Sequence, residues 1–125
     1  KPTRHGVAFW LVQGDRVLLR RRPESGLLGG MIEVPSTDWR AEPWTLSDAA
    51  RALPLPATLD LLPGTVRHTF THFHLELRVT TGRAAGGRAD DGFWCTLDGL
   101  ADQALPTVMK KVVAHALLHA GPEPR

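Results

Sequence analysis

The first strongly patterned segment of the chain runs from Arg4 to Val12 and is apolar on both of its faces. Val7, Phe9 and Leu11 alternate there with Ala8, Trp10 and Val12. Two apolar faces are typical of a strand at the centre of a sheet. The turn residues Gln13-Gly14-Asp15 follow, and residues 17–22 predict a second strand that returns as a hairpin.

The middle of the chain predicts three short elements separated by prolines. They are a strand over residues 31–34, a helix from about Thr45 to Leu53, and a weak strand over residues 59–69. Thr45 or Ser47 is the candidate N-cap of the helix, and the carboxylate of Asp48 favours its first turn. Pro54 and Pro56 then end this helix, because proline has no N–H to continue it.

The last third of the chain contains the clearest alternation. The apolar residues Phe73, Leu75, Leu77 and Val79 alternate with His74, Glu76, Arg78 and Thr80. This pattern predicts a half-buried antiparallel strand with one core face and one polar face. A glycine-rich loop over residues 82–92, a strand over 93–97 and a helix over 107–120, entered through Pro106, are predicted next. The expected apolar stripe of that helix is Met109, Val112, Val113, Ala116, Leu117 and Ala120, and Gly121-Pro122 is expected to end it.

This order of elements predicts one mixed α+β domain over residues 1–125, built from hairpins, with helices packed on its sheet. A chain of 125 residues is the length of a single ordinary domain. Its apolar content of 42% and charged content of 22% are typical of globular proteins. No apolar stretch approaches the roughly 18–20 residues that span a bilayer, so no membrane partner is expected.

The single cysteine, Cys95, excludes an internal disulfide and a multi-cysteine zinc or iron–sulfur site within this chain. This usage favours a reducing compartment and hence the cytoplasm. The N-terminal residues Lys1-Pro2-Thr3-Arg4-His5 include no initiator methionine and no signal-peptide apolar region. We therefore expect a processed start or a piece of a longer protein.

Positive charge is concentrated near the start of the chain, although the net charge is only +2. Arg20, Arg21 and Arg22 are consecutive, and like charges this close repel unless something anionic lies near. A solvated surface is the simple alternative for the remaining arginines. Alternation along a strand sends Arg21 to the opposite face from its two neighbours, so the sequence does not decide which of the three would meet a ligand.

Gly29-Gly30-Met31-Ile32-Glu33, followed by a loop and a helix, resembles the start of a Nudix box, in which spaced glutamates bind Mg²⁺ on a diphosphate. Counted from Gly30, the box positions fall on Ser36, Trp44 and Thr45, and only Asp48 supplies a carboxylate. Anchored on Ile32-Glu33-Val34-Pro35, the box arginine falls on Arg51 and the glutamates become Ala52, Leu55 and Pro56. Both registers predict a Nudix-like scaffold without a diphosphate-hydrolysing metal site.

Three histidines, His68, His72 and His74, lie within seven residues and are of a type that zinc accepts. His72 and His74 share a strand face, but no nearby acid or cysteine completes a site, so no metal is predicted. A strand with a polar outer face explains His74 and Glu76. It does not explain Phe70-Thr71-His72, which places an aromatic, a hydroxyl and an imidazole between two strands.

The segment Arg67-His68-Thr69-Phe70-Thr71-His72-Phe73-His74-Leu75 resembles the signature of the C-terminal domain of adenine DNA glycosylases, the MutY family. Residues 25–36, Ser-Gly-Leu-Leu-Gly-Gly-Met-Ile-Glu-Val-Pro-Ser, are similar to another segment of that domain, with Ile32 and Val34 where aromatics are usual. The ending, Leu105-Pro106-Thr107 into Met109-Lys110-Lys111, is also similar. The resemblance covers nearly the whole chain and implies a Nudix-like domain that recognises 8-oxoguanine opposite adenine in DNA during base-excision repair.

The family resemblance implies lesion contacts from Phe70, Thr71 and His72, where Thr71 replaces the usual serine but keeps its hydroxyl. Oxidation turns guanine N7 into a donor and adds a carbonyl at C8, and a hydroxyl can accept from one and donate to the other. Phe70 is an exposed aromatic that can wedge into a base step, or alternatively a loop ring folded back on the core. His72 either contacts phosphate, orients the loop, or bonds only to backbone. Backbone phosphate contacts are expected among the basic residues Arg20, Arg21, Arg22, Arg67 and His68.

The glycosylase machinery of that family is absent from this sequence, so the chain alone is expected to cleave no glycosidic bond. The resemblance implies a parent adenine DNA glycosylase, a hydrolase of N-glycosidic bonds. Its iron–sulfur cluster belongs to an N-terminal domain, and no cofactor is expected in this segment. The implied partners are damaged double-stranded DNA and that N-terminal domain, in a bacterial, nucleoid-associated cytoplasmic protein. The alternatives are a degenerate Nudix nucleotide hydrolase and a protein-interaction domain that uses the same loop.

Overall fold

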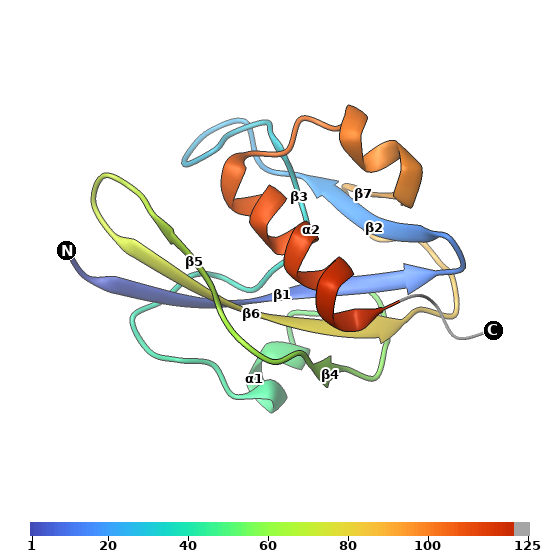
Figure 1. Ribbon diagram of the computed structural model, residues 1–125, viewed down its shortest axis with the longest axis horizontal. Coiled ribbons are helices and arrows are strands. Elements are labelled where there is room, and N and C mark those ends of the chain that lie inside the picture. The colour runs from blue at the N-terminus through green and yellow to red at the C-terminus, as the bar shows by residue number, and fades with distance from the viewer. Residues whose placement is uncertain (122–125) are drawn as a thin grey trace.

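The computed structural model describes residues 1–121 (Figure 1). Seven strands of this part of the chain form one sheet in which the order β3-β2-β1-β6-β4 is extended by β5 on β6 and β7 on β2. The strands are β1 (Thr3–Gln13), β2 (Arg16–Arg21), β3 (Ile32–Glu33), β4 (Asp60–Leu61), β5 (Val66–Thr69), β6 (His74–Arg83) and β7 (Gly92–Thr96). The helices are α1 (Leu46–Ala50), the 3₁₀ helix η1 (Leu97–Asp102) and α2 (Thr107–Ala120). The mixed α+β class predicted from the sequence is confirmed.

The two long central strands, β1 and β6, are parallel. Their register runs from Thr3 opposite His74 to Val12 opposite Arg83. Strand β6 pairs antiparallel with β4 and β5, so the predicted antiparallel strand is correct for these partners and wrong for β1. Alternation identifies the faces of a strand but carries no information on the direction of its neighbours.

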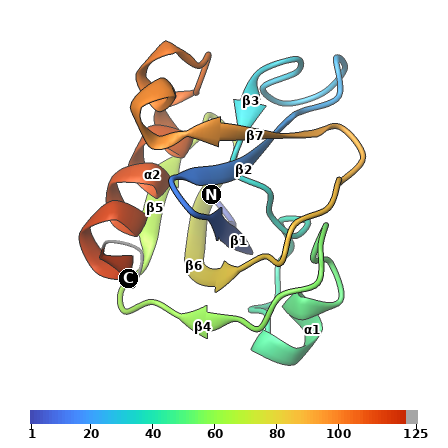
Figure 2. The ribbon, with the colours of Figure 1, turned by 90° about the vertical axis from the view of Figure 1, so that its right-hand side faces the viewer.

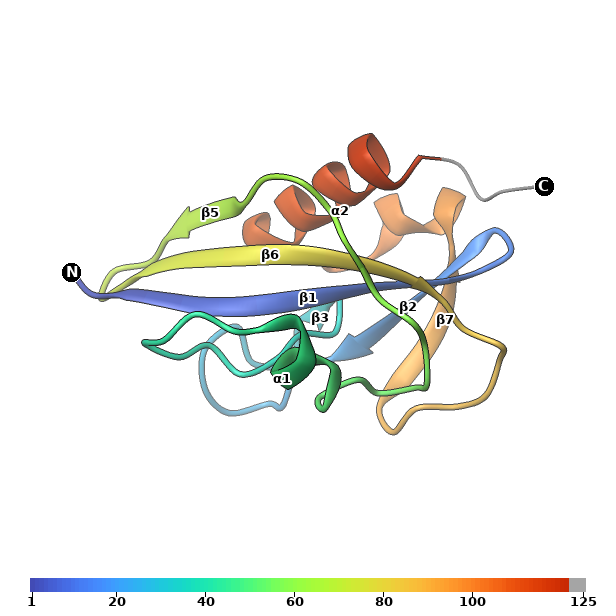
Figure 3. The same cartoon turned by 90° about the horizontal axis from the view of Figure 1, so that it is seen from below.

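Helices cover both faces of the sheet (Figure 3), with α2 on one face and α1 on the other. Figure 2 shows the strands between these two helices. Strand β1 contributes Ala8 and Trp10 to the larger hydrophobic cluster, which contains Val108, Met109, Val112 and Ala116 of α2. It contributes Val7, Phe9 and Leu11 to the second cluster, which contains Ala49 of α1. The prediction that β1 is a central strand with two apolar faces is therefore confirmed.

The helix boundaries follow the predicted caps with some differences. The Thr45 side chain accepts a hydrogen bond from the Asp48 N–H and caps α1, but this helix ends at Ala50 and not near Leu53. Pro106 is the N-cap of α2, as expected, and Gly121, with φ of 70°, follows the last residue of this helix. Pro122, the other half of the predicted stop, lies outside the described residues.

The buried stripe of α2 differs from the prediction at two positions. Val108 is buried although it was not included in the stripe, whereas the Leu117 residue is 49% exposed. Leu117 is near the end of the helix that borders a hollow formed with Trp10 and Leu97. No helix among residues 1–121 is long and apolar enough to cross a membrane.

A divergence between strands creates the space for the candidate site. Strand β2 pairs with β1 only at Val12–Val17 and Gln13–Arg16, and further along it pairs with β3. The N-terminal half of β1 instead bonds to residues 35–40, through Phe9 N–H to Pro35 O and Thr37 N–H to Val7 O. Residues 35–40 therefore take the place of β2 beside this half of β1. Strand β2 diverges from β1 there, and the cleft lies between β2 and residues 35–40.

Candidate functional site

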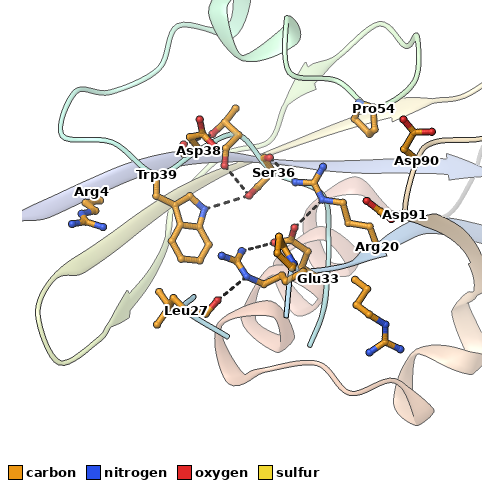
Figure 4. A pocket seen from close by; sticks show the side chains of 14 residues that line it. Arg4, Arg20, Leu27, Glu33, Ser36, Asp38, Trp39, Pro54, Asp90 and Asp91 are labelled. Atoms are coloured by element: carbon orange, nitrogen blue, oxygen red, sulfur yellow. Dashed lines mark hydrogen bonds and ion pairs between the residues drawn. The ribbon is translucent and has the colours of Figure 1, made fainter. Parts of the chain in front are cut away.

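The cleft between β2, β3 and residues 36–39 has a volume of about 810 Å³ (Figure 4). Four arginines line it, Arg4, Arg20, Arg21 and Arg22, together with Glu33, Ser36, Trp39 and several rim residues. We call this space the arginine cleft. Three further acidic residues, Asp38, Asp90 and Asp91, also line it. With Glu33, the four carboxylates of the lining balance the four guanidiniums in formal charge, so the cleft offers individual guanidiniums and no net excess of positive charge.

Glu33 holds two of the arginines in place. Its side chain is only 4% exposed, and its two carboxylate oxygens accept hydrogen bonds of 2.8 Å from Arg20 Nε and from Arg22 Nη1. Arg20 also donates to the Ser36 carbonyl at 2.9 Å, and Arg22 to the Leu27 carbonyl at 3.0 Å. Charge-assisted bonds of this kind fix a guanidinium in one orientation. Because one carboxylate balances two guanidiniums, the trio retains one positive charge.

Trp39 forms the wall of the arginine cleft that adjoins the β5–β6 turn. The Arg22 guanidinium lies 4.9 Å from the centre of its ring. Its indole N–H donates to the Ser36 hydroxyl at 3.3 Å, a contact drawn in Figure 4. On the side of the turn, the indole stacks with Phe70 at 6.0 Å and an interplanar angle of 25°. Trp39 therefore contacts both the arginine cleft and the candidate lesion loop.

Phe70, Thr71 and His72 form the tight turn between β5 and β6, which we call the reading loop. The Phe70 N–H donates to the Phe73 carbonyl at 2.9 Å and closes the turn. Thr71 and His72 are exposed at its tip. The expectation of an exposed Phe70 is wrong. Its ring is half-buried among Trp39, Phe73 and His68, as in the folded-back alternative, because these rings offer it aromatic contact.

The predicted phosphate contacts separate into two groups. Arg20, Arg21 and Arg22 line the arginine cleft, and Arg21 is an exposed residue that donates to the Gly30 carbonyl at 2.6 Å. Arg21 does not share the Glu33 carboxylate, yet it lines the same cleft as its two neighbours, so alternation along the strand does not separate the three arginines. Arg67 and His68 belong to β5, a strand of the same sheet that lies next to α2 (Figure 3), and neither residue lines the cleft. The structure therefore does not bring all five residues into one patch.

Neighbouring side chains compensate part of the charge of Arg67 and His68. Arg67 Nε bonds to the Glu76 carboxylate at 3.3 Å. The Lys111 ammonium donates to His68 Nδ1 at 3.1 Å and to the Arg67 carbonyl at 3.0 Å. Burial, and next the Lys111 charge, lower the pKa of His68 from its ordinary value. His68 is thereby favoured in its neutral form, which makes Lys111 the better cation to meet an anion there.

Residues 45–56 would carry the acids of a Nudix box, and we call them the box segment. Ala52 and Pro56 are exposed, whereas Leu55 is buried in the cluster that contains Ala49. Asp48 is exposed and lies 3.7 Å from Arg40. No group of three or more His, Cys, Asp or Glu side chains within residues 1–121 is arranged to hold a metal ion.

Sequence reasoning missed Glu33 and Trp39 as site residues. A signal for Glu33 existed, because an acid between the apolar residues Ile32 and Val34 follows shortly after three consecutive arginines. Trp39 lies in an irregular stretch, and nothing in its local pattern indicates that it stacks on a ring 31 residues further along.

Comparison with known proteins agrees with this architecture. A family model described as "NUDIX domain" matches residues 7–115. The chain is 37% identical over 111 residues to the adenine DNA glycosylase of Homo sapiens, an alignment that covers 79% of this chain and 20% of that protein. Thus the chain spans about a fifth of the length of this relative.

Two solved structures show the same fold. The C-terminal domain of mouse MUTYH, solved in complex with human PCNA, is 27% identical, with a TM-score of 0.70 over 98% of this chain and 92% of that chain. A NUDIX hydrolase from Nitrosomonas europaea has a TM-score of 0.73 at 14% identity, over 94% of this chain and 90% of that chain. At that identity the second match concerns the fold alone.

The mixed sheet with helices on both of its faces and the family match together define the class of protein. The chain belongs to the NUDIX domain family. Within this class it resembles the C-terminal domain of adenine DNA glycosylases, both in sequence and in structure.

Proposed function

We propose that this chain is the non-catalytic lesion-recognition domain of an adenine DNA glycosylase that acts in DNA repair. In this role it recognises 8-oxoguanine opposite adenine in double-stranded DNA, and an N-terminal domain of the same protein carries the glycosidic chemistry. The similarity to adenine DNA glycosylases supports the DNA-repair part of this proposal. The observation that carries the lesion part is the exposed Thr71 hydroxyl at the tip of a loop anchored by aromatic packing.

Thr71 has the chemistry that 8-oxoguanine requires. Its hydroxyl donates one hydrogen bond and accepts others, so a single group can donate to the C8 carbonyl and accept from the N7–H of the lesion. Undamaged guanine presents an acceptor at N7 and no carbonyl at C8, so the same hydroxyl loses one of the two bonds. His72 is exposed beside Thr71, and in this proposal it contacts an adjacent phosphate or orients the loop. Phe70 supports the loop from below through its ring contacts.

The arginine cleft supplies charge for the DNA backbone in this proposal. Arg20, Arg21 and Arg22 line it, and the fixed guanidiniums of Arg20 and Arg22 are pre-oriented by Glu33. Preorganised guanidiniums bind phosphate oxygens with less loss of side-chain entropy. Lys111, near Arg67 and His68, provides a separate positive position on the α2 side. Backbone contacts give affinity for any sequence, whereas the reading loop gives the preference for the lesion.

The test is single-turnover adenine release by the full-length glycosylase on two duplexes, with adenine opposite 8-oxoguanine or opposite guanine. Thr71→Val keeps the shape of the side chain and removes both hydrogen bonds. We expect the preference for the lesion to fall by about 1–3 kcal/mol in transition-state free energy. Thr71→Ser should change little, because it keeps the hydroxyl.

Thr58→Val is a matched control, since Thr58 is also exposed but lies before β4, outside the reading loop. It should leave the preference unchanged. The proposal fails if Thr71→Val keeps the preference of the unmodified enzyme. A melting curve of each variant shows whether a loss arises from unfolding, which would make Thr71 a structural residue.

A further inference from the structure

We propose that Trp39 is a positioning residue for lesion recognition, which holds the reading loop in place and couples it to the arginine cleft. This inference rests on the proposed function, because it assumes that the loop meets the lesion. Trp39 itself lies in the arginine cleft and not at the loop tip. Its role is argued from what holds the indole and from what the indole holds.

The indole of Trp39 is fixed by three different contacts. Its edge lies against the backbone of β1 at Gly6, where an added Cβ would meet Trp39 Cδ1 at 2.6 Å. Its N–H donates to the Ser36 hydroxyl at 3.3 Å, and the Ser36 hydroxyl in turn donates to the Thr37 carbonyl at 3.0 Å. The Arg22 guanidinium lies over its ring at 4.9 Å. An aromatic ring held by backbone, hydrogen bond and cation has a single orientation.

The fixed indole supports the reading loop through aromatic packing. Phe70 stacks on Trp39 at 6.0 Å, and Phe73 lies 6.4 Å from the same indole. These two phenylalanines bracket Thr71 and His72, and their rings are 4.9 Å apart. The tip residues themselves are exposed. The aromatic base below the loop therefore determines where the Thr71 hydroxyl is presented.

A continuous chain of contacts leads from the cleft to the loop. Glu33 holds Arg22, Arg22 lies on Trp39, and Trp39 packs on Phe70, the residue directly before Thr71. A phosphate that binds Arg22 stabilises the orientation of the guanidinium over the indole. Backbone binding in the cleft and lesion reading at the loop are thus coupled through one aromatic ring, since packed side chains transmit such constraints.

A second tryptophan provides a matched control. Trp44 is also half-buried, has the Arg40 guanidinium 3.7 Å from its ring centre and donates its indole N–H to the His5 carbonyl at 3.0 Å. It packs against the cluster on the α1 face, whereas Trp39 packs against the cluster that includes Phe70 and Phe73. The two residues share chemistry and exposure class and differ in whether they contact the loop.

The experiment compares Trp39→Leu with Trp44→Leu in the full-length enzyme and in the 125-residue chain. We expect Trp39→Leu to lower the preference for adenine opposite 8-oxoguanine by about tenfold, a typical size for coupled neighbours. Trp39→Phe should recover most of the preference. Trp44→Leu should not change it, although both leucine variants lose a similar amount of packing. In the Thr71→Val background, Trp39→Leu should have no further effect on the preference.

Amide hydrogen exchange in the 125-residue chain gives a readout that is independent of catalysis. Trp39→Leu should accelerate exchange of the Phe70 amide, which closes the turn, more than exchange of the β1 amides. Trp44→Leu should not have this local effect. If Trp39→Leu prevents folding, Trp39→Phe is compared with Trp44→Phe, and the Phe70 amide should still exchange faster only in the first.

Two results would overturn the inference, and they are distinguishable. If Thr71→Val lowers the preference but Trp39→Leu behaves as Trp44→Leu does, the loop reads the lesion without help from Trp39. If Thr71→Val leaves the preference intact, the proposed function fails, and with it the assignment of Trp39 to lesion reading.

Discussion

The arginine cleft with its reading loop and the box segment lie in the same small domain but differ in how their polar groups are used. In the cleft, the carboxylate of Glu33 is buried and bonded to two guanidiniums. In the box segment, the only acid, Asp48, is exposed and makes a single ion pair of 3.7 Å with Arg40. Polar groups buried in a bonded network have one arrangement, whereas exposed pairs contribute little to stability.

This difference is the basis of the proposal that the Nudix scaffold serves recognition here and not hydrolysis. The helix that would present metal ligands is short here and is followed by Ala52, Leu55 and Pro56. Around Trp39, by contrast, a stacked ring, a guanidinium and a hydrogen bond all contact one indole. The polar and aromatic side chains with fixed partners lie at the cleft and the loop. The site proposed for DNA is therefore placed there.

The largest expected effect is on stability and comes from Glu33. Glu33→Gln leaves two guanidiniums without their carboxylate. We expect the free energy of unfolding to fall by about 2–3 kcal/mol, below the full effect of breaking a buried pair because Arg20 and Arg22 are 29% and 19% exposed. Urea unfolding of the 125-residue chain measures this change.

The box segment provides the comparison for that measurement. Asp48→Asn should lower the free energy of unfolding by less than about 1 kcal/mol, because its ion pair is exposed. Equal effects of the two substitutions would mean that the Glu33 network is no more important to the fold than a surface pair.

A smaller effect is expected on the salt dependence of DNA binding. Arg21 and Arg51 are both exposed, but Arg21 lines the arginine cleft whereas Arg51 follows α1. Arg21→Gln should make the slope of log Kobs against log salt concentration shallower by about 0.9, the contribution of one phosphate contact. Arg51→Gln should leave the slope as it is. A slope that changes only for Arg51→Gln would move the DNA surface to the box segment.

The last prediction concerns nucleotide hydrolysis, the activity that the Nudix scaffold suggests, and no turnover is expected. The chain, supplied with nucleoside triphosphates and Mg²⁺, should give no turnover above a blank, because Ala52, Leu55 and Pro56 supply no carboxylate. Phosphate release is the measurement. Mg²⁺-dependent turnover that is lost in Asp48→Asn would show that the box segment still has chemistry.

Much of the fold follows from local pattern. The two apolar faces of β1 place it at the centre, and Thr45 and Pro106 mark the starts of the helices as the sequence predicts. The parallel pairing of β1 with β6 does not follow, because it joins residues about 70 positions apart and alternation is the same for either direction. The short α1 also differs, since only Ala49 of its residues is buried and little packing supports a longer helix.

The candidate site could be predicted only in part. The exposed positions of Thr71 and His72 agree with a loop between two strands. The sequence left open whether Phe70 is exposed or folded back on the core, because its stacking partner Trp39 comes from a distant irregular segment. Likewise, the three arginines indicate an anion in the sequence, and the structure shows that the nearest anion for two of them is internal, the Glu33 carboxylate.

One measurement tests the central claim most directly. The ¹⁵N-labelled 125-residue chain is titrated with a duplex that contains 8-oxoguanine opposite adenine and, separately, with the same duplex containing guanine, while amide and indole N–H shifts are followed. We predict that both duplexes shift the Arg21 amide and the Trp39 indole, and that only the lesion duplex shifts Thr71 and His72 further. The Trp44 indole and residues 45–56 should not respond. Shifts confined to residues 45–56, or identical shifts of Thr71 and His72 with both duplexes, would contradict the account.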